Sequence, residues 1–200
     1  LVQVMIKPFS QACENNKGPI LEVLKTAFNK TKSVLEVGSG TGQHSVFFAE
    51  QLPHLQWYTS DRRINHEGIN LWHKEANLTN LHGPLELDLN YAWPVNNVDA
   101  IYTANTFHIV SWQLVEQFFK GVSTHLASQG VVCIYGPFKY QGQFTSASNE
   151  EFDRFLTQRD PFSGIRDFEA IEQLATQASL TLISDTAMPA NNQLLVFKRQ

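Results

Sequence analysis

The stretch LEVGSGTGQH, residues 35–44, decides the fold of this 200-residue chain. An apolar run that suits a buried strand leads into glycines at positions 38, 40 and 42, and a helical pattern begins at Gln43. Glycine lets the backbone adopt positive φ and pass close to a ligand, and the first amides of a helix have no partners within it. The stretch therefore predicts a strand, a tight turn and a helix that hold a ligand, with a purely structural turn as the alternative.

The spacing of the glycines separates the possible ligands. A phosphate-binding P-loop continues Gly-Lys-Ser/Thr, whereas Gly42 is followed by Gln43 and His44. The dinucleotide fingerprint is Gly-x-Gly-x-x-Gly, and here the last glycine comes one residue early. Glu36 precedes Gly38 by two residues, where its charge opposes a pyrophosphate and favours an ammonium group. The pattern therefore disfavours a nucleoside triphosphate and a nicotinamide dinucleotide, and favours another adenosine cofactor.

Apolar runs alternate with helical patterns along most of the chain. The predicted strands are 33–38, 55–61, 84–89, 98–105 and 130–136. The predicted helices are 18–30, with Pro19 near its start, then 43–52, 67–75 and 112–126. Strands separated by helices imply right-handed crossovers and a mainly parallel sheet.

The C-terminal part follows a different pattern. After a helix around Phe168–Ala178, the strands 180–189 and 192–199 are too close in sequence for a helical crossover, so they form an antiparallel pair. The predicted fold class is α/β, with a doubly wound, mainly parallel seven-stranded sheet and an antiparallel C-terminal strand pair. We expect a single domain over 1–200, with an N-terminal helical segment at about 9–31 and a lid loop at 137–147.

Two carboxylates end predicted strands. Asp61 closes the second strand, and a carboxylate at this position accepts hydrogen bonds from both ribose hydroxyls of an adenosine cofactor. Asp88 lies at the end of the third strand. Because parallel strands deliver their carboxyl ends to one edge, we expect both side chains beside the glycine turn, although each could instead only cap a loop.

The glycine motif with Glu36 resembles motif I of the class I S-adenosylmethionine-dependent methyltransferases. The resemblance implies that Glu36 holds the methionine part of that cofactor, that the backbone at Gly38, Gly40 and Gly42 lies along it, and that Asp88 lies near the adenine. In combination, ENNKGPIL, SGTGQH, SDRR, NTFHI, YGPF, SNEEFD, GIRD and MPANN resemble the methyltransferase-like group called domain of unknown function 938, over about residues 9–198. That group commonly has arginine where Asn15 stands here, so a contact of that arginine is not transferred.

Candidate catalytic residues follow the fourth and fifth strands. In this fold, the loop after the fourth strand brings the methyl donor and the acceptor together. Asn105 is the candidate contact for the methionine end, and His108 the candidate base or positioning donor for the acceptor. Tyr135 presents an aromatic face that would stabilise a sulfonium. The alternative is packing, with His108 against Trp112 and Tyr135 in the core.

Other candidates lie near the first helix and late in the chain. Asn16 and Lys17 are positioned to fold over the cofactor, and a lysine near a helix start opposes the helix dipole, which suggests a separate role. Arg166 is a candidate clamp for a carboxylate or a phosphate, or else a structural residue.

Composition narrows the classes of partner. The formal net charge is −4 without a basic cluster, which argues against nucleic acid. The 7 histidines and 2 cysteines have no metal-ligand spacing, and we expect neither a metal nor a disulfide. No apolar stretch reaches membrane-spanning length and no signal-peptide pattern is present, so we expect a cytoplasmic protein without a membrane partner.

The sequence thus predicts an S-adenosylmethionine-dependent methyltransferase that acts on a small molecule. An S-adenosylmethionine-binding interaction or regulatory protein without transferase activity is the first alternative. A nicotinamide oxidoreductase is the second, disfavoured by the glycine spacing, Glu36 and the lack of a Tyr-x-x-x-Lys pair. The pattern does not indicate an oligomeric state.

Overall fold

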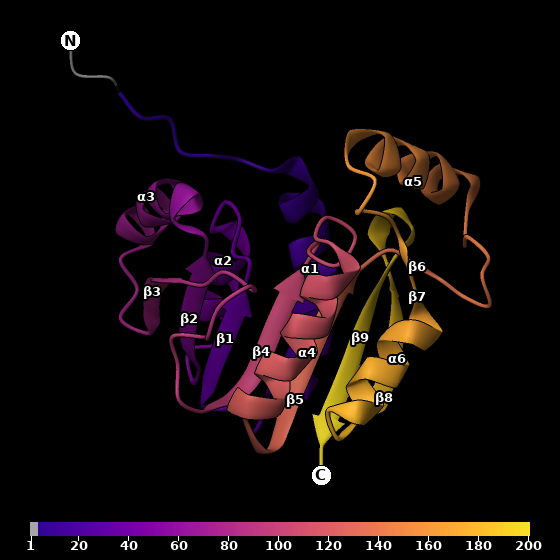
Figure 1. The fold of residues 1–200 in the computed structure, drawn as a ribbon. Helices are drawn as coiled ribbons and strands as arrows, with labels where there is room; N and C mark the ends of the chain where they lie inside the picture. The colour runs from indigo at the N-terminus through magenta and orange to yellow at the C-terminus, as the bar shows by residue number, and fades with distance from the viewer. Residues whose placement is uncertain (1–3) are drawn as a thin grey trace.

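A computed structural model describes residues 4–200; residues 1–3 of the predicted domain lie outside the described residues. Its main sheet has seven strands in the order β3-β2-β1-β4-β5-β9-β8 (Figure 1). They are β1 (Ser33–Val37), β2 (Gln56–Asp61), β3 (Leu81–Glu86), β4 (Val98–Ala104), β5 (Leu126–Gly136), β8 (Leu180–Met188) and β9 (Asn192–Arg199). Strand β9 is antiparallel to both its neighbours, and all other pairs are parallel. The predicted fold class is confirmed.

Helices cover both faces of this sheet. They are α1 (Gln11–Ala27), α2 (Gln43–Gln51), α3 (His66–Ala76), α4 (Trp112–His125), α5 (Ala147–Arg159) and α6 (Phe168–Gln177). Helices α1 and α2 pack on one face and α4 and α6 on the other (Figure 1). Beyond the sheet's edge, α5 lies near a small second sheet that β6 (Phe138–Lys139) forms with β7 (Arg166–Asp167).

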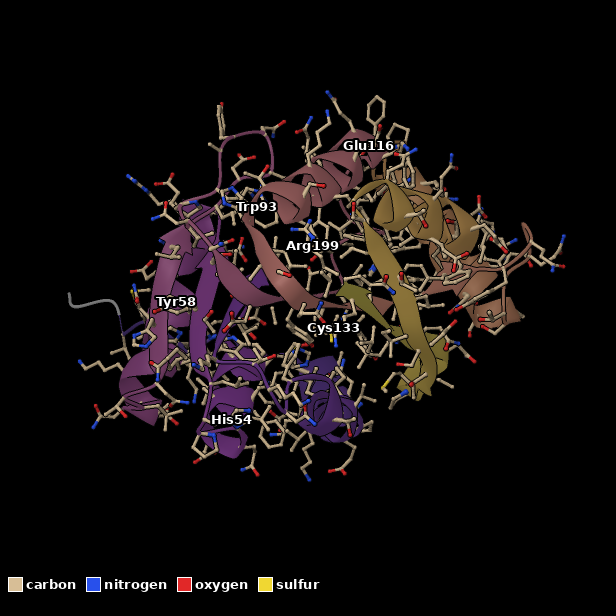
Figure 2. The ribbon with its side chains drawn as sticks, turned by 90° about the horizontal axis from the view of Figure 1, so that it is seen from below. His54, Tyr58, Trp93, Glu116, Cys133 and Arg199 are labelled. Carbon is tan, nitrogen blue, oxygen red and sulfur yellow. The ribbon has the colours of Figure 1, made fainter. Side chains whose placement is uncertain are left out.

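Two apolar layers result from the alternation of side chains along the strands. On β5, Cys133 and Tyr135 join the layer under α1 and α2, whereas Ile134 joins the layer under α4 and α6. Figure 2 shows Cys133 on the α1 side and Trp93 on the α4 side of the sheet. Because successive strand residues point to opposite faces, strands buried on both faces read as continuous apolar runs.

The third strand was predicted three residues too late. It spans 81–86 rather than 84–89, because its partner β2 ends at Asp61, which pairs with Glu86. The Leu87 amide makes a further bond to the Asp61 carbonyl (3.1 Å), and the chain then leaves the sheet. Leu87 and Leu89 remain buried, so their apolar pattern continues past the strand.

The first helix begins seven residues before the predicted start. It starts at Gln11, where the Ser10 side chain accepts a hydrogen bond from the Cys13 amide (3.3 Å). Pro19 therefore lies inside the helix and offers no N–H to the carbonyl of Asn15. Both residues are exposed, so water can satisfy that carbonyl. The prediction that proline marks the start was wrong.

Arg199 caps the C-terminal ends of two helices. Its guanidinium donates to the carbonyls of Val122 and Ser123 in the last turn of α4 (both 3.3 Å), to Leu126, and to Ala178 just after α6 (3.2 Å). The carbonyl of Val122 also accepts from the Leu126 amide, whereas the last carbonyls of a helix otherwise have no partners within it.

We expect Arg199→Met to lower the free energy of unfolding by about 1–3 kcal/mol, since hydrogen bonds from a charged donor are lost and carbonyls are left without partners. Urea denaturation measures this change. Arg154→Met is the matched control, because Arg154 makes only an exposed pair with Glu150 and should cost less than about 1 kcal/mol. Equal effects of the two substitutions would contradict the capping role.

Candidate functional site

The glycine turn is fixed to the end of β2. The amides of Gly38 and Ser39 both donate to the carbonyl of Ser60 (3.1 and 2.9 Å), and the Gly40 amide donates to Oδ2 of Asp61 (2.8 Å). Gly38 and Gly40 have φ of 75° and 58°, which disfavour residues with a Cβ. The predicted strand, turn and helix are present, and the turn joins two neighbouring strand ends.

A cavity of about 730 Å³ opens at this edge of the sheet. Six of the residues predicted to bind a cofactor line it: Glu36, Gly38, Gly40, Asp61, Asp88 and Asn105. Ser10, Cys13, Thr41 and His44 complete the wall near the turn, none of which was singled out as a binding residue in the sequence. The opposite end is formed by the loop after β4 and by the segment after α5.

Glu36 is a buried carboxylate on the cavity wall. Burial raises its pKa to about 7, and the neighbouring charge of Asp61 adds to the rise, while Ser39 and Trp57 oppose it. The Trp57 indole donates to Oε1 at 3.5 Å. Within residues 4–200, no lysine, arginine or histidine forms an ion pair with Glu36. The site therefore offers a negative group that a bound cation would stabilise.

A buried chain of hydrogen bonds lies behind Glu36. Nδ1 of His44 is 3.0 Å from the Tyr102 hydroxyl, and Nε2 is 2.6 Å from Oδ1 of Asn16. Because Asn16 Oδ1 only accepts, Nε2 carries the proton and Nδ1 accepts from Tyr102. Burial lowers the pKa of His44 to about 4, so the ring is neutral. Asn16, predicted to touch the cofactor, instead supports a lining residue from behind.

The strand-end carboxylates already have backbone partners. Oδ1 of Asp61 accepts from the amide of Arg62 (2.7 Å) and from the side chain of Asn65 (3.0 Å), in addition to the Gly40 bond at Oδ2. Oδ1 of Asp88 accepts from the backbone and side chain of Asn90 (both 2.9 Å). Since each oxygen accepts two hydrogen bonds, Asp61 keeps one acceptor site, on Oδ2, and Asp88 keeps two, on its own Oδ2.

Two predicted cofactor residues besides Asn16 lie outside the lining. Lys17 pairs with Glu14 at 2.5 Å and lies over the ring of Phe47. At Gly42, a Cβ would press against Ile69 of α3 at 3.3 Å, so this glycine allows two helices to pack closely. Gly42 serves the turn through packing rather than through direct contact with the cavity.

The two predicted catalytic side chains also lie outside the lining. His108 is buried and packs edge-on against Phe152 of α5, and burial, with the charges of Arg166 and Arg159, lowers its pKa to about 4. Tyr135 is buried in the layer under α1. Catalysis by either residue stays a prediction, and this geometry does not favour it.

The predicted lid segment 137–147 is held away from the cavity, which none of its residues lines. Its Tyr140 hydroxyl donates to Asp185 of β8 (2.6 Å), and its Gln141 amide donates to Glu169 of α6 (2.8 Å). The segment is therefore attached to the far end of the sheet.

The chain before α1 crosses the glycine turn instead. The Trp72 indole of α3 donates to the carbonyl of Pro8 (2.7 Å), Lys7 pairs with Glu75 (2.8 Å), and the Ser10 amide donates to the Gln43 side chain (2.6 Å). These contacts bring Ser10 and the start of α1 to the cavity. In the sequence, Ser10 could have indicated this start of α1, because serine is a preferred N-cap residue.

The sheet order, the reversed β9, the glycine turn and the carboxylates at the strand ends together define the Rossmann-like methyltransferase fold. Among solved structures, the chain is similar to an O-methyltransferase family protein from Burkholderia thailandensis (TM-score 0.81, 14% identity, 92% of this chain and 56% of that chain). It is also similar to an O-methyltransferase family 2 protein from Planctomyces limnophilus in complex with apigenin (TM-score 0.79, 15% identity, 94% of this chain and 58% of that chain). A third similar structure is CalO1, a methyltransferase of calicheamicin biosynthesis, in its SAH-bound form (TM-score 0.74, 19% identity, 92% of this chain and 54% of that chain).

At these identities the likeness shows the fold, and the chain spans little more than half the length of these proteins. The family model described as "Protein of unknown function (DUF938)" matches residues 7–199. The chain belongs to this family.

Residues 4–200 show neither a metal cluster nor a membrane-spanning helix. No group of three or more His, Cys, Asp and Glu side chains there could hold a metal ion. None of the helices there combines the length and the apolar character that a membrane crossing requires.

The burial of His108 predicts a pH dependence of stability. Its pKa is about 4 when folded, against an ordinary 6.5, so between these values the unfolded chain binds a proton that the folded protein does not. The stability contribution is complete above pH 6.5 and falls by up to about 3 kcal/mol as the pH approaches 4. Denaturation at a series of pH values should show a shallower acid slope for His108→Gln than for the unaltered chain. Parallel slopes would rule out this neutral, buried state.

Proposed function

We propose that the protein is an S-adenosylmethionine-dependent methyltransferase that acts on a small molecule. The observation that carries this proposal is Glu36, a buried carboxylate on the cavity wall that has no cationic partner within the described chain. A ligand that brings an ammonium group to Glu36 compensates its burial. The methionine part of S-adenosylmethionine carries such a group.

The neighbouring residues suit the rest of this cofactor. The backbone at Gly38 and Gly40 allows close approach, and Asp61 beside it is proposed to accept a hydrogen bond from a ribose hydroxyl at the remaining acceptor site of Oδ2. Asp88, farther along the same edge, suits the adenine amino group. Asn105, which follows β4 directly and lines the cavity, is proposed to contact the methionine part.

When bound, S-adenosylmethionine supplies a methyl carbon that an acceptor's lone pair takes as the C–S electron pair returns to sulfur. The residues of this chain orient the two reactants and exclude water between them. Val37 and Ala104 contribute apolar side chains to the cavity wall. A proton lost from the acceptor passes to solvent or to a lining carboxylate, because the lining residue His44 has a pKa of about 4 and already uses both ring nitrogens in hydrogen bonds.

The apigenin complex of a structural neighbour and the apolar walls here support a small-molecule acceptor. We infer that methyltransferase-like protein 26, which the sequence motifs resemble, is a relative. Two free cysteines, Cys13 and Cys133, support a cytoplasmic location. The alternative, a cofactor-binding regulatory protein without transferase activity, is favoured by one observation: His108 and Tyr135 lie outside the cavity lining.

Calorimetry with S-adenosylmethionine, S-adenosylhomocysteine, NAD and ATP tests the cofactor. We expect binding of the first two only, and binding of NAD alone would refute the proposal. A methylation screen of a metabolite extract, with labelled cofactor, then separates an enzyme from a binding protein. Transfer of label to no metabolite by a protein that binds the cofactor would favour the regulatory alternative.

The raised pKa of Glu36 predicts pH-dependent affinity for S-adenosylhomocysteine. An ammonium group favours the carboxylate, so affinity should be complete above pH 7 and fall by about tenfold per pH unit below it. Titrations between pH 5.5 and 7.5 measure this dependence. Glu36→Gln should bind more weakly at pH 7.5 and lose the slope, whereas a slope preserved in that variant would exclude Glu36 as its source.

We expect Asp61→Asn to weaken S-adenosylhomocysteine binding by about 1–3 kcal/mol, the scale of hydrogen bonds to a charged group. The variant loses the charge that a ribose hydroxyl would bond to. Its single side-chain oxygen accepts from the Gly40 amide or the Arg62 amide but not from both, so urea denaturation first checks that the variant is folded. Asp160→Asn, at the other end of the same cavity, is the control and should bind the cofactor normally. Calorimetry measures both, and comparable losses would show that the effect is not specific to the ribose site.

A further inference from the structure

The end of the cavity that faces away from the glycine turn is apolar. Ile109 and Val110 from the loop after β4, and Leu114 from the first turn of α4, form one wall. The ring of Phe162, after α5, forms another and is 71% exposed. An exposed ring at the mouth of a cavity favours an apolar ligand that covers it.

This end has no cation in its lining. Among the described residues that line the cavity, the only arginine or lysine is Arg62, which adjoins Asp61 at the cofactor end. Four carboxylates line the cavity: Glu36, Asp61, Asp88 and Asp160. An anionic ligand would lose its hydration here without an ionic partner and would meet charges of its own sign.

Arg166, predicted as a clamp for an anion, holds the wall from behind. Its Nε donates to the carbonyl of Phe107 (2.9 Å), and its Nη2 donates to those of Val110 (2.6 Å) and Phe162 (2.8 Å). It is absent from the lining, as is Arg159, which lies over the Phe155 ring at 5.9 Å. The cations near this end are therefore not presented to a ligand.

Asp160 offers a carboxylate oxygen at the apolar end. It lies just after α5, and its Oδ1 accepts from the Phe162 amide (2.9 Å). Within residues 4–200, Oδ2 has no hydrogen-bond donor or ion pair. Phe162 belongs to the same lining, and an aromatic side chain near a carboxylate favours a cation.

We infer that the methyl acceptor is an apolar small molecule without an anionic group, and that Asp160 and Phe162 select a basic nitrogen at its outer end. This inference rests on the proposed function in so far as it calls the ligand a methyl acceptor. The preference for a basic nitrogen follows from the residues that line the cavity. The apolar body of the molecule lies against Ile109, Val110 and Leu114. Carboxylates, phosphates and sulfates of the same shape are rejected.

Three compounds of one shape test the selectivity: naphthylmethylamine, naphthylmethanol and naphthylacetate. Calorimetry is done with the protein saturated with S-adenosylhomocysteine, and the amine should bind at least about tenfold more tightly than the acid, with the alcohol between them. Asp160→Asn retains an oxygen for the Phe162 amide and should bring the amine to the level of the alcohol. Glu150→Gln, on the exposed side of α5, removes the same charge away from the cavity and should leave the order unchanged.

The outcomes separate this inference from the proposed function. Failure of S-adenosylhomocysteine to bind would refute the function, and the three compounds are then compared on the protein alone, where the same order is expected. An acid that binds as tightly as the amine would overturn the inference. So would an order that Asp160→Asn leaves unchanged, or a cavity that binds none of the three compounds.

Discussion

The hydrogen bond from the Gly40 amide to the Asp61 carboxylate joins the ends of the first two strands, and the cavity depends on it. The other oxygen of Asp61 receives the Arg62 amide and the Asn65 side chain, so one carboxylate fixes both the glycine turn and the chain that leaves β2. A site whose backbone is fixed before binding loses less entropy when it takes up a ligand. Asp61 thus fixes the backbone of the cavity wall, and it is also proposed to bind the cofactor.

A second constraint follows, because this arrangement places Asp61 near the buried Glu36. Burial is the main cause of the raised pKa of Glu36, and the negative charge of Asp61 raises it further. Neither carboxylate has a lysine or arginine ion pair within residues 4–200, although such a pair would stabilise the free protein. The unfavourable electrostatics are relieved when a cationic ligand binds, which is the usual relation between local instability and function.

The sheet and the glycine turn could be predicted because buried parallel strands are continuous apolar runs that end at polar residues. The third strand could not be placed correctly, since Leu87 and Leu89 continue its apolar pattern after β2 has ended and hydrogen-bonded pairing, not the pattern, sets the boundary. Distance from a strand end likewise does not give the direction of a side chain. Tyr135 lies two residues after Cys133 on the same strand, so both side chains point to the α1 face. This alternation could have shown from the sequence that Tyr135 belongs to the core.

The two ends of the cavity are held by different means. The cofactor end is bonded to strands β1 and β2, whereas the walls of the outer end are bonded to each other. The Gly164 amide donates to the His108 carbonyl (3.0 Å), and Arg166 ties the loop after β4 to the segment after α5. Changes in the outer walls would therefore alter the proposed acceptor while the turn at Gly40 stays in place, as expected for a function built on a shared fold. Asp160, the C-cap residue of helix α5, lies at this end, so the proposed selectivity depends on an element that the sequence pattern did not predict, because α5 has few buried side chains and its apolar pattern is weak.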